Sequence, residues 1–127
     1  MIPQPNLATL LNLYQGDRQL FFARISPDYV CHTPGASQIA GRFVGPEGMA
    51  AHGKQMRDLT NQTFKVSLVG DILINDVHAM APVELTAERG GQSLKMLAFG
   101  VWRFDGELVV EHWECPVELS KFDAFWS

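Results

Sequence analysis

The sequence predicts a single α+β domain in which a strongly curved, mostly antiparallel sheet wraps around three helices. Apolar residues recur at helical spacing in the first 60 residues and at a period of two in the second half. The predicted helices form only one layer, so the sheet must curl around them to bury its apolar face. We therefore expect a cone with an internal pocket. The length of 127 residues suffices for one such core, and we expect one domain over 1–127.

Two short helices are expected to form a hairpin at the start of the chain. In 7–14 the apolar residues recur at i, i+3, i+4 and i+7, with Asn6 as a plausible N-cap and Gly16 as the stop. Asp17 can cap a second helix. That helix must end before the Ser-Pro-Asp stretch at 26–28, because proline cannot continue it.

A brief strand and a third helix follow the hairpin. Residues 29–33 form a short β-branched and aromatic run between two proline-containing turns, which predicts a strand. A glycine-bearing loop is expected from there to Gly45. Pro46 suits the first position of a helix, and the apolar face of this helix ends at 60–61.

The second half is predicted to be an antiparallel meander. Alternating residues in 63–74 indicate a strand with a bend or bulge at Gly70. Pro82 removes a ladder donor, so we expect an edge position or a bulge near it. Tight turns join three further predicted strands, at 78–88, 93–104 and 107–115.

Composition and charge argue against several classes of partner. Ten Lys and Arg residues stand against fourteen Asp and Glu, giving a net charge of −4, and the basic residues are scattered. Nucleic-acid binding requires a concentrated positive face, so we expect no nucleic-acid partner. No window approaches the roughly 20 apolar residues that a bilayer span requires. We expect no membrane partner and a cytoplasmic location.

Cofactor and metal motifs are missing from the sequence. Cys31 and Cys115 lack CxxC spacing and are expected to be buried free thiols, although the sequence leaves a disulfide between them open. The four histidines, at 32, 52, 78 and 112, show neither HxH nor HExxH spacing. Phosphate-binding glycine motifs are also absent. We expect neither a metal nor a cofactor.

Several segments resemble SnoaL-like proteins of the nuclear-transport-factor-2-like superfamily, in which the ketosteroid isomerases are more distant members. The first-strand and loop signature, the last hairpin and the terminal segment match at 30–35, 39–48, 101–108, 111–113 and 122–126. The resemblance covers nearly the whole chain and implies the cone-shaped fold. It is specific for fold and not for function, because the superfamily contains isomerases, cyclases, dehydratases, epoxide hydrolases and non-catalytic binders.

The resemblance also implies two catalytic candidates, each with a structural alternative. The isomerases carry a catalytic aspartate at the position of His32, which could carry protons or be a hydrogen-bonded strand residue. Their oxyanion acid matches Gly100, so steroid isomerisation by that mechanism is not expected. SnoaL-like cyclases carry an acidic residue five positions before a second aspartate, and counting back from Asp123 gives Glu118. Glu118 could act as an acid or base beside an apolar wall, or be solvated.

The pocket wall is expected to come from apolar strand faces and from the helices, although ordinary core packing explains any one of these residues equally well. Of Glu111 and His112, only one can face the pocket. By analogy with the isomerases we expect Glu111 and Trp113 to point inward. The other predicted ligand-binding residues are Tyr14, Phe22, Met49, His52, Met56, Val83, Leu85, Met96, Ala98 and Trp102.

Two functions remain open at this point. The first is binding of a small hydrophobic molecule with acid/base isomerase, cyclase or dehydratase chemistry on a carbonyl-type compound. The alternative is a non-catalytic binding or dimerisation module. Perturbed pKa values in the pocket would favour the first. Leu97, Phe99 and Val101 form an apolar stripe on the outer side of the sheet, which predicts a homodimer through this face.

Overall fold

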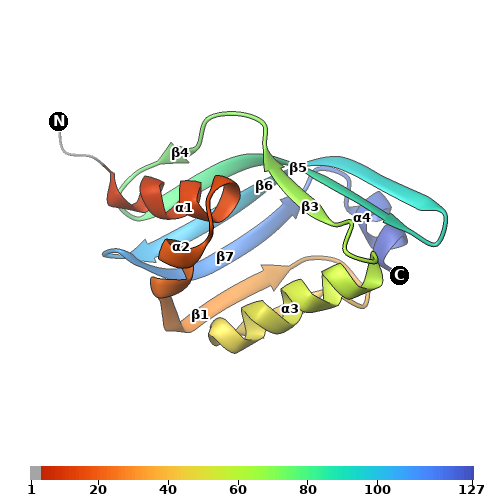
Figure 1. Ribbon diagram of the computed structural model, residues 1–127, viewed down its shortest axis with the longest axis horizontal. Helices are drawn as coiled ribbons and strands as arrows, with labels where there is room; N and C mark the ends of the chain where they lie inside the picture. Colours follow the sequence, from red (N-terminus) through yellow and green to blue (C-terminus); the bar gives the residue numbers. More distant parts are fainter. Residues whose placement is uncertain (1–3) are drawn as a thin grey trace.

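The computed structural model describes residues 4–127 and shows a curled sheet with helices on its inner face (Figure 1). The helices are α1 (Pro5–Gln15), α2 (Gln19–Ala23), α3 (Gly45–Leu59) and α4 (Leu119–Trp126). The strands are β1 (Ile25–Thr33), β2 (Gly41–Val44), β3 (Lys65–Leu68), β4 (Leu73–Ile74), β5 (His78–Arg89), β6 (Gln92–Asp105) and β7 (Leu108–Pro116).

The strands form one sheet in the order β2-β1-β7-β6-β5-β3, and β4 also pairs with β5. β1 runs parallel to β7, and the other pairings among the described strands are antiparallel. The predicted fold class, α+β with a curved and mostly antiparallel sheet around helices, is confirmed. Within 4–127, no helix is long and apolar enough to cross a membrane.

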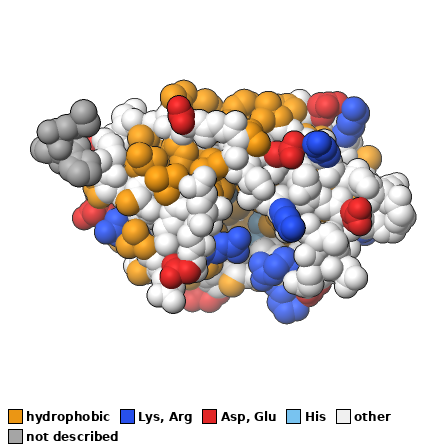
Figure 2. All heavy atoms as spheres, turned by 45° about the horizontal axis from the view of Figure 1, so that its top comes forward, with side chains coloured by type: hydrophobic (Ala, Val, Ile, Leu, Met, Phe, Trp, Pro, Cys, Tyr) orange, Lys and Arg blue, Asp and Glu red, His pale blue; other side chains and the backbone are white. Residues whose placement is uncertain are grey.

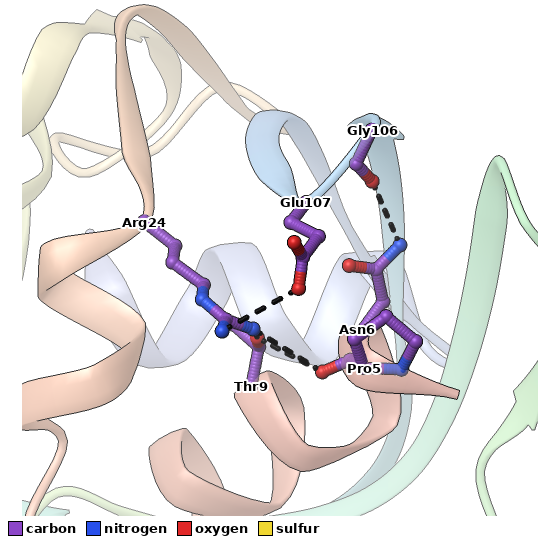
Figure 3. Close-up of polar contacts among 6 residues, drawn as sticks. All are labelled: Pro5, Asn6, Thr9, Arg24, Gly106 and Glu107. Atoms are coloured by element: carbon purple, nitrogen blue, oxygen red, sulfur yellow. Dashed lines mark hydrogen bonds and ion pairs between the residues drawn. The ribbon is translucent and has the colours of Figure 1, made fainter. Parts of the chain in front are cut away.

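The first helix is anchored to the tip of the last hairpin. Asn6, expected as the N-cap, lies instead inside α1, which begins one residue earlier. Its Nδ2 donates a hydrogen bond of 3.1 Å to the carbonyl oxygen of Gly106 (Figure 3). Arg24 donates to the Thr9 hydroxyl at 2.9 Å and forms an ion pair of 3.5 Å with Glu107. These contacts tie α1, the start of β1 and the β6–β7 turn together.

The second helix has a different N-cap from the one expected, and the strand after it is longer than predicted. Arg18, and not Asp17, is the N-cap of α2, and its side chain makes no capping hydrogen bond. Asp17 lies one residue earlier, where its carboxylate accepts a hydrogen bond from the Gln19 amide at 3.1 Å. β1 starts at Ile25 and not at Tyr29. Its pairing with β7 shifts register between Ile25 and Val30, around the proline of this segment.

Pro82 lies within β5 without the predicted bulge, since β5 and β6 pair without a register shift. Its carbonyl oxygen accepts a hydrogen bond from the Val69 amide at 3.0 Å. In an antiparallel strand the N–H and C=O of one residue point to the same side, so the missing donor faces the break between β3 and β4. The ladder to β6 therefore loses nothing. The stretch 63–74, predicted as one bent strand, is two strands separated at this break.

Two elements were not predicted. β2 lies in the stretch expected to be a loop, and it pairs antiparallel with β1 at the edge of the sheet. α4 forms from the terminal segment, where three buried side chains, Phe122, Phe125 and Trp126, recur at helical spacing. Because Phe122 and Trp126 are almost fully buried, α4 is part of the core.

The inner face of the sheet packs into two apolar clusters. One forms beneath α1 and α2 and includes Leu10, Phe21, Tyr29, Trp102 and Phe104. The other forms between α3, α4 and the middle of β5 and β6 and includes Ile39, Met56, Val83, Met96 and Trp126. Tyr14 and Ile72 pack against both clusters.

Replacing Trp126 with alanine tests the role of α4. The side chain is fully buried, so Trp126→Ala should lower the free energy of unfolding by about 3–5 kcal/mol, measured by urea denaturation. Leu119→Ala is the matched control, because Leu119 lies on the same helix but is 43% exposed. That variant should cost less than about 1 kcal/mol. Equal losses in both variants would contradict a core role for α4.

Candidate functional site

A cavity of about 370 Å³ lies between the two apolar clusters. This volume is within the range of small-molecule sites. Figure 2 shows the hollow, with Lys and Arg side chains on its rim and a histidine visible inside. The walls come from α1, α3, α4, β1, β3, β5, β6 and β7 and from two connecting residues. The polar side chains among them include Tyr14, Tyr29, Cys31, His52, Trp102, His112 and Glu114.

Glu114 on β7 carries the carboxyl group of the cavity. It lies opposite Gly100 on β6, and residues that pair directly across two strands project to the same face of a sheet. The hydroxyl of Thr33 donates a hydrogen bond of 3.1 Å to its Oε2. Burial raises the pKa of Glu114 to about 7, and the Thr33 hydrogen bond only partly opposes this effect. The carboxyl group therefore exchanges its proton near neutral pH.

His52 on α3 holds Thr33 in position. The His52 Nε2 atom lies 3.2 Å from the Ile39 carbonyl oxygen and 3.2 Å from Thr33 Oγ1. A carbonyl oxygen only accepts, so Nε2 carries the hydrogen and the Thr33 hydroxyl is left to donate to Glu114. Burial lowers the pKa of His52 to about 4, which keeps the ring neutral. The contacts form a fixed chain from α3 through β1 to the carboxyl group on β7.

Tyr14 on α1 brings a hydroxyl group over Gly100. A Cβ atom on Gly100 would lie 2.7 Å from Tyr14 Oη, so a side chain at this position would displace the tyrosine. The Trp102 indole N–H donates to Tyr14 Oη at 3.0 Å. The tyrosine hydrogen is therefore free to donate to a molecule in the cavity. Burial raises the pKa of Tyr14, so it stays a neutral donor.

His112 on β7 contributes an acceptor. Its Nδ1 lies 2.9 Å from the Val101 carbonyl oxygen and must donate to it, which leaves Nε2 with a lone pair. The ring stacks on Trp102 with 3.6 Å between centroids. Burial lowers the pKa of His112 to about 3, so the ring is neutral at physiological pH.

Tyr29 and Cys31 on β1 complete the polar part of the wall. The Tyr29 hydroxyl is buried and has no hydrogen-bond partner among residues 4–127. Burial raises the pKa of Tyr29, and it raises the pKa of Cys31 to about 12. Both groups therefore keep their protons. An unpaired buried hydroxyl costs free energy, and a ligand that accepts from it would remove that cost.

Three of these side chains could approach a metal ion. Ligand atoms of Cys31, His52 and Glu114 lie within 4.8 Å of one another, and this is the only such group in the described part of the chain. The sequence could not reveal it, because the residues come from β1, α3 and β7. The bonded His52 nitrogen already donates to Ile39, and the Cys31 thiol is protonated, so these donors do not form a ready ligand set.

Comparison with solved structures identifies the fold. A protein from a soil-derived mobile gene cassette, Bal32a, matches with a TM-score of 0.86 and 29% identity, covering 97% of each chain. A protein from Burkholderia pseudomallei, described as NTF2-like and of unknown function, matches with a TM-score of 0.82 and 13% identity over 98% of this chain and 99% of its own. The chain has the nuclear-transport-factor-2-like (NTF2-like) fold.

The SnoaL resemblance is also supported at the level of fold. A protein from Jannaschia, described as a SnoaL-like polyketide cyclase, matches this NTF2-like chain with a TM-score of 0.76 and 14% identity, covering 100% of this chain and 96% of its own. No protein-family model and no curated protein matches the sequence.

Most of the predicted wall residues do lie at the cavity of this NTF2-like structure. These are Tyr14, Met49, His52, Met56, Val83, Leu85, Ala98 and Trp102. Met96 is buried in the apolar cluster beside the cavity and does not line it. Phe22 is 51% exposed and does not line the cavity.

The expected inward orientation of Glu111 and Trp113 is wrong, because both lie on the outer face. Trp102 faces the cavity, and its partner across the β6–β7 ladder is His112. The register shifts by one residue between Arg103 and Phe104. Without this bulge Trp102 would pair with Glu111, so the bulge exchanges the two faces of β7. The same exchange brings in Glu114, which the sequence analysis missed.

His32 and Glu118, the catalytic candidates, do not reach the cavity. His32 Nε2 lies 2.7 Å from Glu111 Oε2 on the outer face, and the His32 ring stacks on Trp113. Arg103 Nε donates to the other Glu111 oxygen at 3.0 Å. Glu118 is exposed and pairs with Lys121 at 2.9 Å. His32 therefore belongs to a hydrogen-bonded contact on the outer face, and Glu118 to a surface ion pair.

The raised pKa of Glu114 predicts a pH-dependent cost to stability. The folded-state pKa of about 7 lies above the ordinary value of 4.5, so the folded state binds the proton more tightly. Wild-type stability contributed by this group is therefore lost as pH rises between these values. Glu114→Gln cannot ionise, and between about pH 5 and pH 8 it should gain on the order of 2–3 kcal/mol relative to wild type.

Urea denaturation of both proteins at the two pH values measures this difference. The other titratable groups of the site are present in both proteins and cancel in the comparison: Tyr14, Tyr29, Cys31 and His52 from other elements, and His112 from the same strand. Glu118→Gln, an exposed carboxylate, is the matched control. A gain of the same size in the control, or none in Glu114→Gln, would contradict the buried-carboxyl assignment.

Proposed function

We propose that the cavity binds a small hydrophobic carbonyl compound and that Glu114 transfers a proton to and from it. The supporting observation is a carboxyl group with a pKa of about 7 on a largely apolar wall that also presents tyrosine hydroxyl groups. A group with this pKa is close to half ionised at neutral pH, where it can act as a base and then as an acid. The proton-transfer roles expected for His32 and Glu118 pass to Glu114.

The residues of the cavity wall would have separate roles in this proton transfer. The substrate carbonyl oxygen accepts a hydrogen bond from Tyr14, and Tyr29 offers a second, unpaired hydroxyl group. Ionised Glu114 removes a proton from the carbon next to the carbonyl. The C–H bond breaks, an O–H bond forms on Glu114, and the electron pair moves to the carbonyl oxygen. The neutral hydroxyl groups stabilise the resulting enolate.

Return of the proton from Glu114 to a different carbon gives an isomerase, and attack of the enolate on a second carbonyl gives a cyclase. The structural likeness to a SnoaL-like polyketide cyclase supports this class of chemistry, although at 14% identity it shows the fold alone. The other candidate function is non-catalytic binding of a small molecule, which requires the cavity but no proton transfer.

Solvent exchange on a simple ketone tests proton transfer directly. We expect the protein to accelerate incorporation of deuterium from D₂O next to the carbonyl of benzylacetone, followed by NMR. Glu114→Gln should lower the rate roughly 100-fold or more, and Tyr14→Phe roughly 10-fold or more. The rate should rise with pH through about 7, because the ionised form of Glu114 is the base.

Glu118→Gln is the matched control and should exchange at the wild-type rate. Quenching of tryptophan fluorescence by the ketone measures binding in the same samples, because Trp102 lines the cavity. Binding without exchange across a panel of ketones would contradict the catalytic proposal and support the non-catalytic binder.

We further propose that two copies associate through the outer face of the sheet. The helices lie on the inner face, which leaves the stripe of Leu97, Phe99 and Val101 without a covering layer. Leu97 is 42% exposed. Cys115, predicted to be buried, is instead an exposed free thiol on the same face, opposite Phe99. Burying such a stripe against a second copy would remove apolar surface from water.

Light scattering at micromolar concentration should therefore give twice the chain mass of 14.1 kDa. Leu97→Glu should give the monomer mass, because the interface would bury an unpaired charge. Ala51→Glu adds the same charge at an exposed position on α3, away from the sheet, and should leave the dimer intact. A monomeric wild type would contradict this proposal.

A further inference from the structure

Three basic side chains line the cavity from different elements. Arg18 precedes α2, Arg57 lies in the last turn of α3, and Lys65 begins β3. All three residues are exposed, which places their charged ends at the opening and not at the floor. Figure 2 shows Lys and Arg side chains around the hollow.

These charges form no ion pair in the described structure. None of the ion pairs within 4–127 includes Arg18, Arg57 or Lys65. Arg57 contributes only a minor part to the lowered pKa of Asp58, which pairs with Lys54. Glu114 is the only acidic residue among the described residues that line the cavity, and it lies among buried groups. The chain as a whole is acidic, with a net charge of −4. Three unpaired cations around one opening therefore depart from the overall charge balance.

Arg57 is the best positioned of the three. A Cβ atom on Gly53, one turn earlier on α3, would lie 3.0 Å from Arg57 Nη1. The guanidinium group therefore lies along the helix surface over Gly53, which itself lines the cavity. A side chain at position 53 would push the guanidinium group away. Arg18 reaches the opening from a left-handed backbone conformation with φ of 70° at the corner between α1 and α2.

We propose that the natural ligand is an amphipathic carboxylate: an apolar body with a carbonyl group inside the cavity and a negatively charged end held at the opening by Arg57, Lys65 and Arg18. This inference rests on the proposed function and adds the substrate class. The charged end stays outside, because an ionised Glu114 would repel it at the floor. The fork of donors on Arg57 suits a planar carboxylate.

Binding of a matched pair of probes tests the proposal. Benzoylpropionate is an aryl ketone with a carboxylate at its far end, and its primary amide has nearly the same shape without the charge. Calorimetry on the full chain should show that the carboxylate binds about five- to tenfold more tightly at low salt. This preference should shrink at about 1 M salt, where the charges are screened.

Substitutions of the basic residues show which side chains cause the preference for the carboxylate. Arg57→Gln should weaken carboxylate binding about two- to fivefold and leave amide binding unchanged. The triple variant R18Q/R57Q/K65Q should abolish the preference. Arg42→Gln is the matched control, because Arg42 is an exposed arginine on β2 that does not line the cavity. It should leave both affinities unchanged.

The proposal is overturned if the amide binds as tightly as the carboxylate, if neither probe binds, or if Arg42→Gln weakens carboxylate binding as much as Arg57→Gln. Failure of the proton-transfer proposal is a separate result. If the wild type exchanges no deuterium into benzylacetone, which has no charge, but still binds the carboxylate more tightly than the amide, proton transfer fails and this proposal stands. If it exchanges deuterium but shows no preference for the carboxylate, this proposal fails and proton transfer stands.

Discussion

The candidate site depends on a one-residue bulge in β7. Because Arg103 pairs with Glu111 while Phe104 pairs with Val109, one residue of β7 has no partner on β6. Successive side chains of a strand point to opposite faces of the sheet, so this single residue decides which alternate side chains of β7 face the cavity. With the bulge, His112 and Glu114 point inward and Glu111 points outward. The outward carboxylate forms ordinary surface ion pairs, whereas the inward one has a strongly raised pKa.

Burial then sets the charge state of every group around Glu114. It raises the pKa of the carboxyl, thiol and phenol groups and lowers the pKa of both imidazoles, so each is shifted toward its neutral form. A neutral imidazole carries one N–H hydrogen. In His52 and His112 this hydrogen lies on the ring nitrogen that bonds a carbonyl oxygen, because a carbonyl oxygen can only accept. Of these groups, only the Glu114 carboxyl group has a pKa close to neutral pH. The full positive charges stay at the opening, where water solvates them.

The sequence predicts most of the fold because its periodicity is strong. Alternation along β5 and β6 correctly places Val83, Leu85, Ala98 and Trp102 on the inner face. The unpredicted α4 carries a helical signal in Phe122, Phe125 and Trp126, but the segment is short. β2 is only four residues long and sits among glycines, so it has little pattern to detect.

The site was harder to predict because alternation alone does not reveal a bulge. Continuing the register from the Asp105–Gly106 turn places Glu111 opposite Trp102, and this is the orientation that the isomerase analogy also favours. Thr33 and His52 come together with Glu114 only through the tertiary fold, from β1, α3 and β7. A local pattern contains no information on such a contact.

Gly100 shows how the chemistry can be supplied from another element. In the sequence, Gly100 stands at the position where the isomerases carry a side-chain acid on the penultimate strand. In the structure, the missing side chain leaves the space that Tyr14 Oη occupies, and Trp102 fixes that oxygen by donating to it. A hydrogen-bond donor is therefore present above β6, but it comes from α1. Since α1 is held to the β6–β7 turn by Asn6 and Arg24, the position of this donor depends on the same hairpin that carries Glu114.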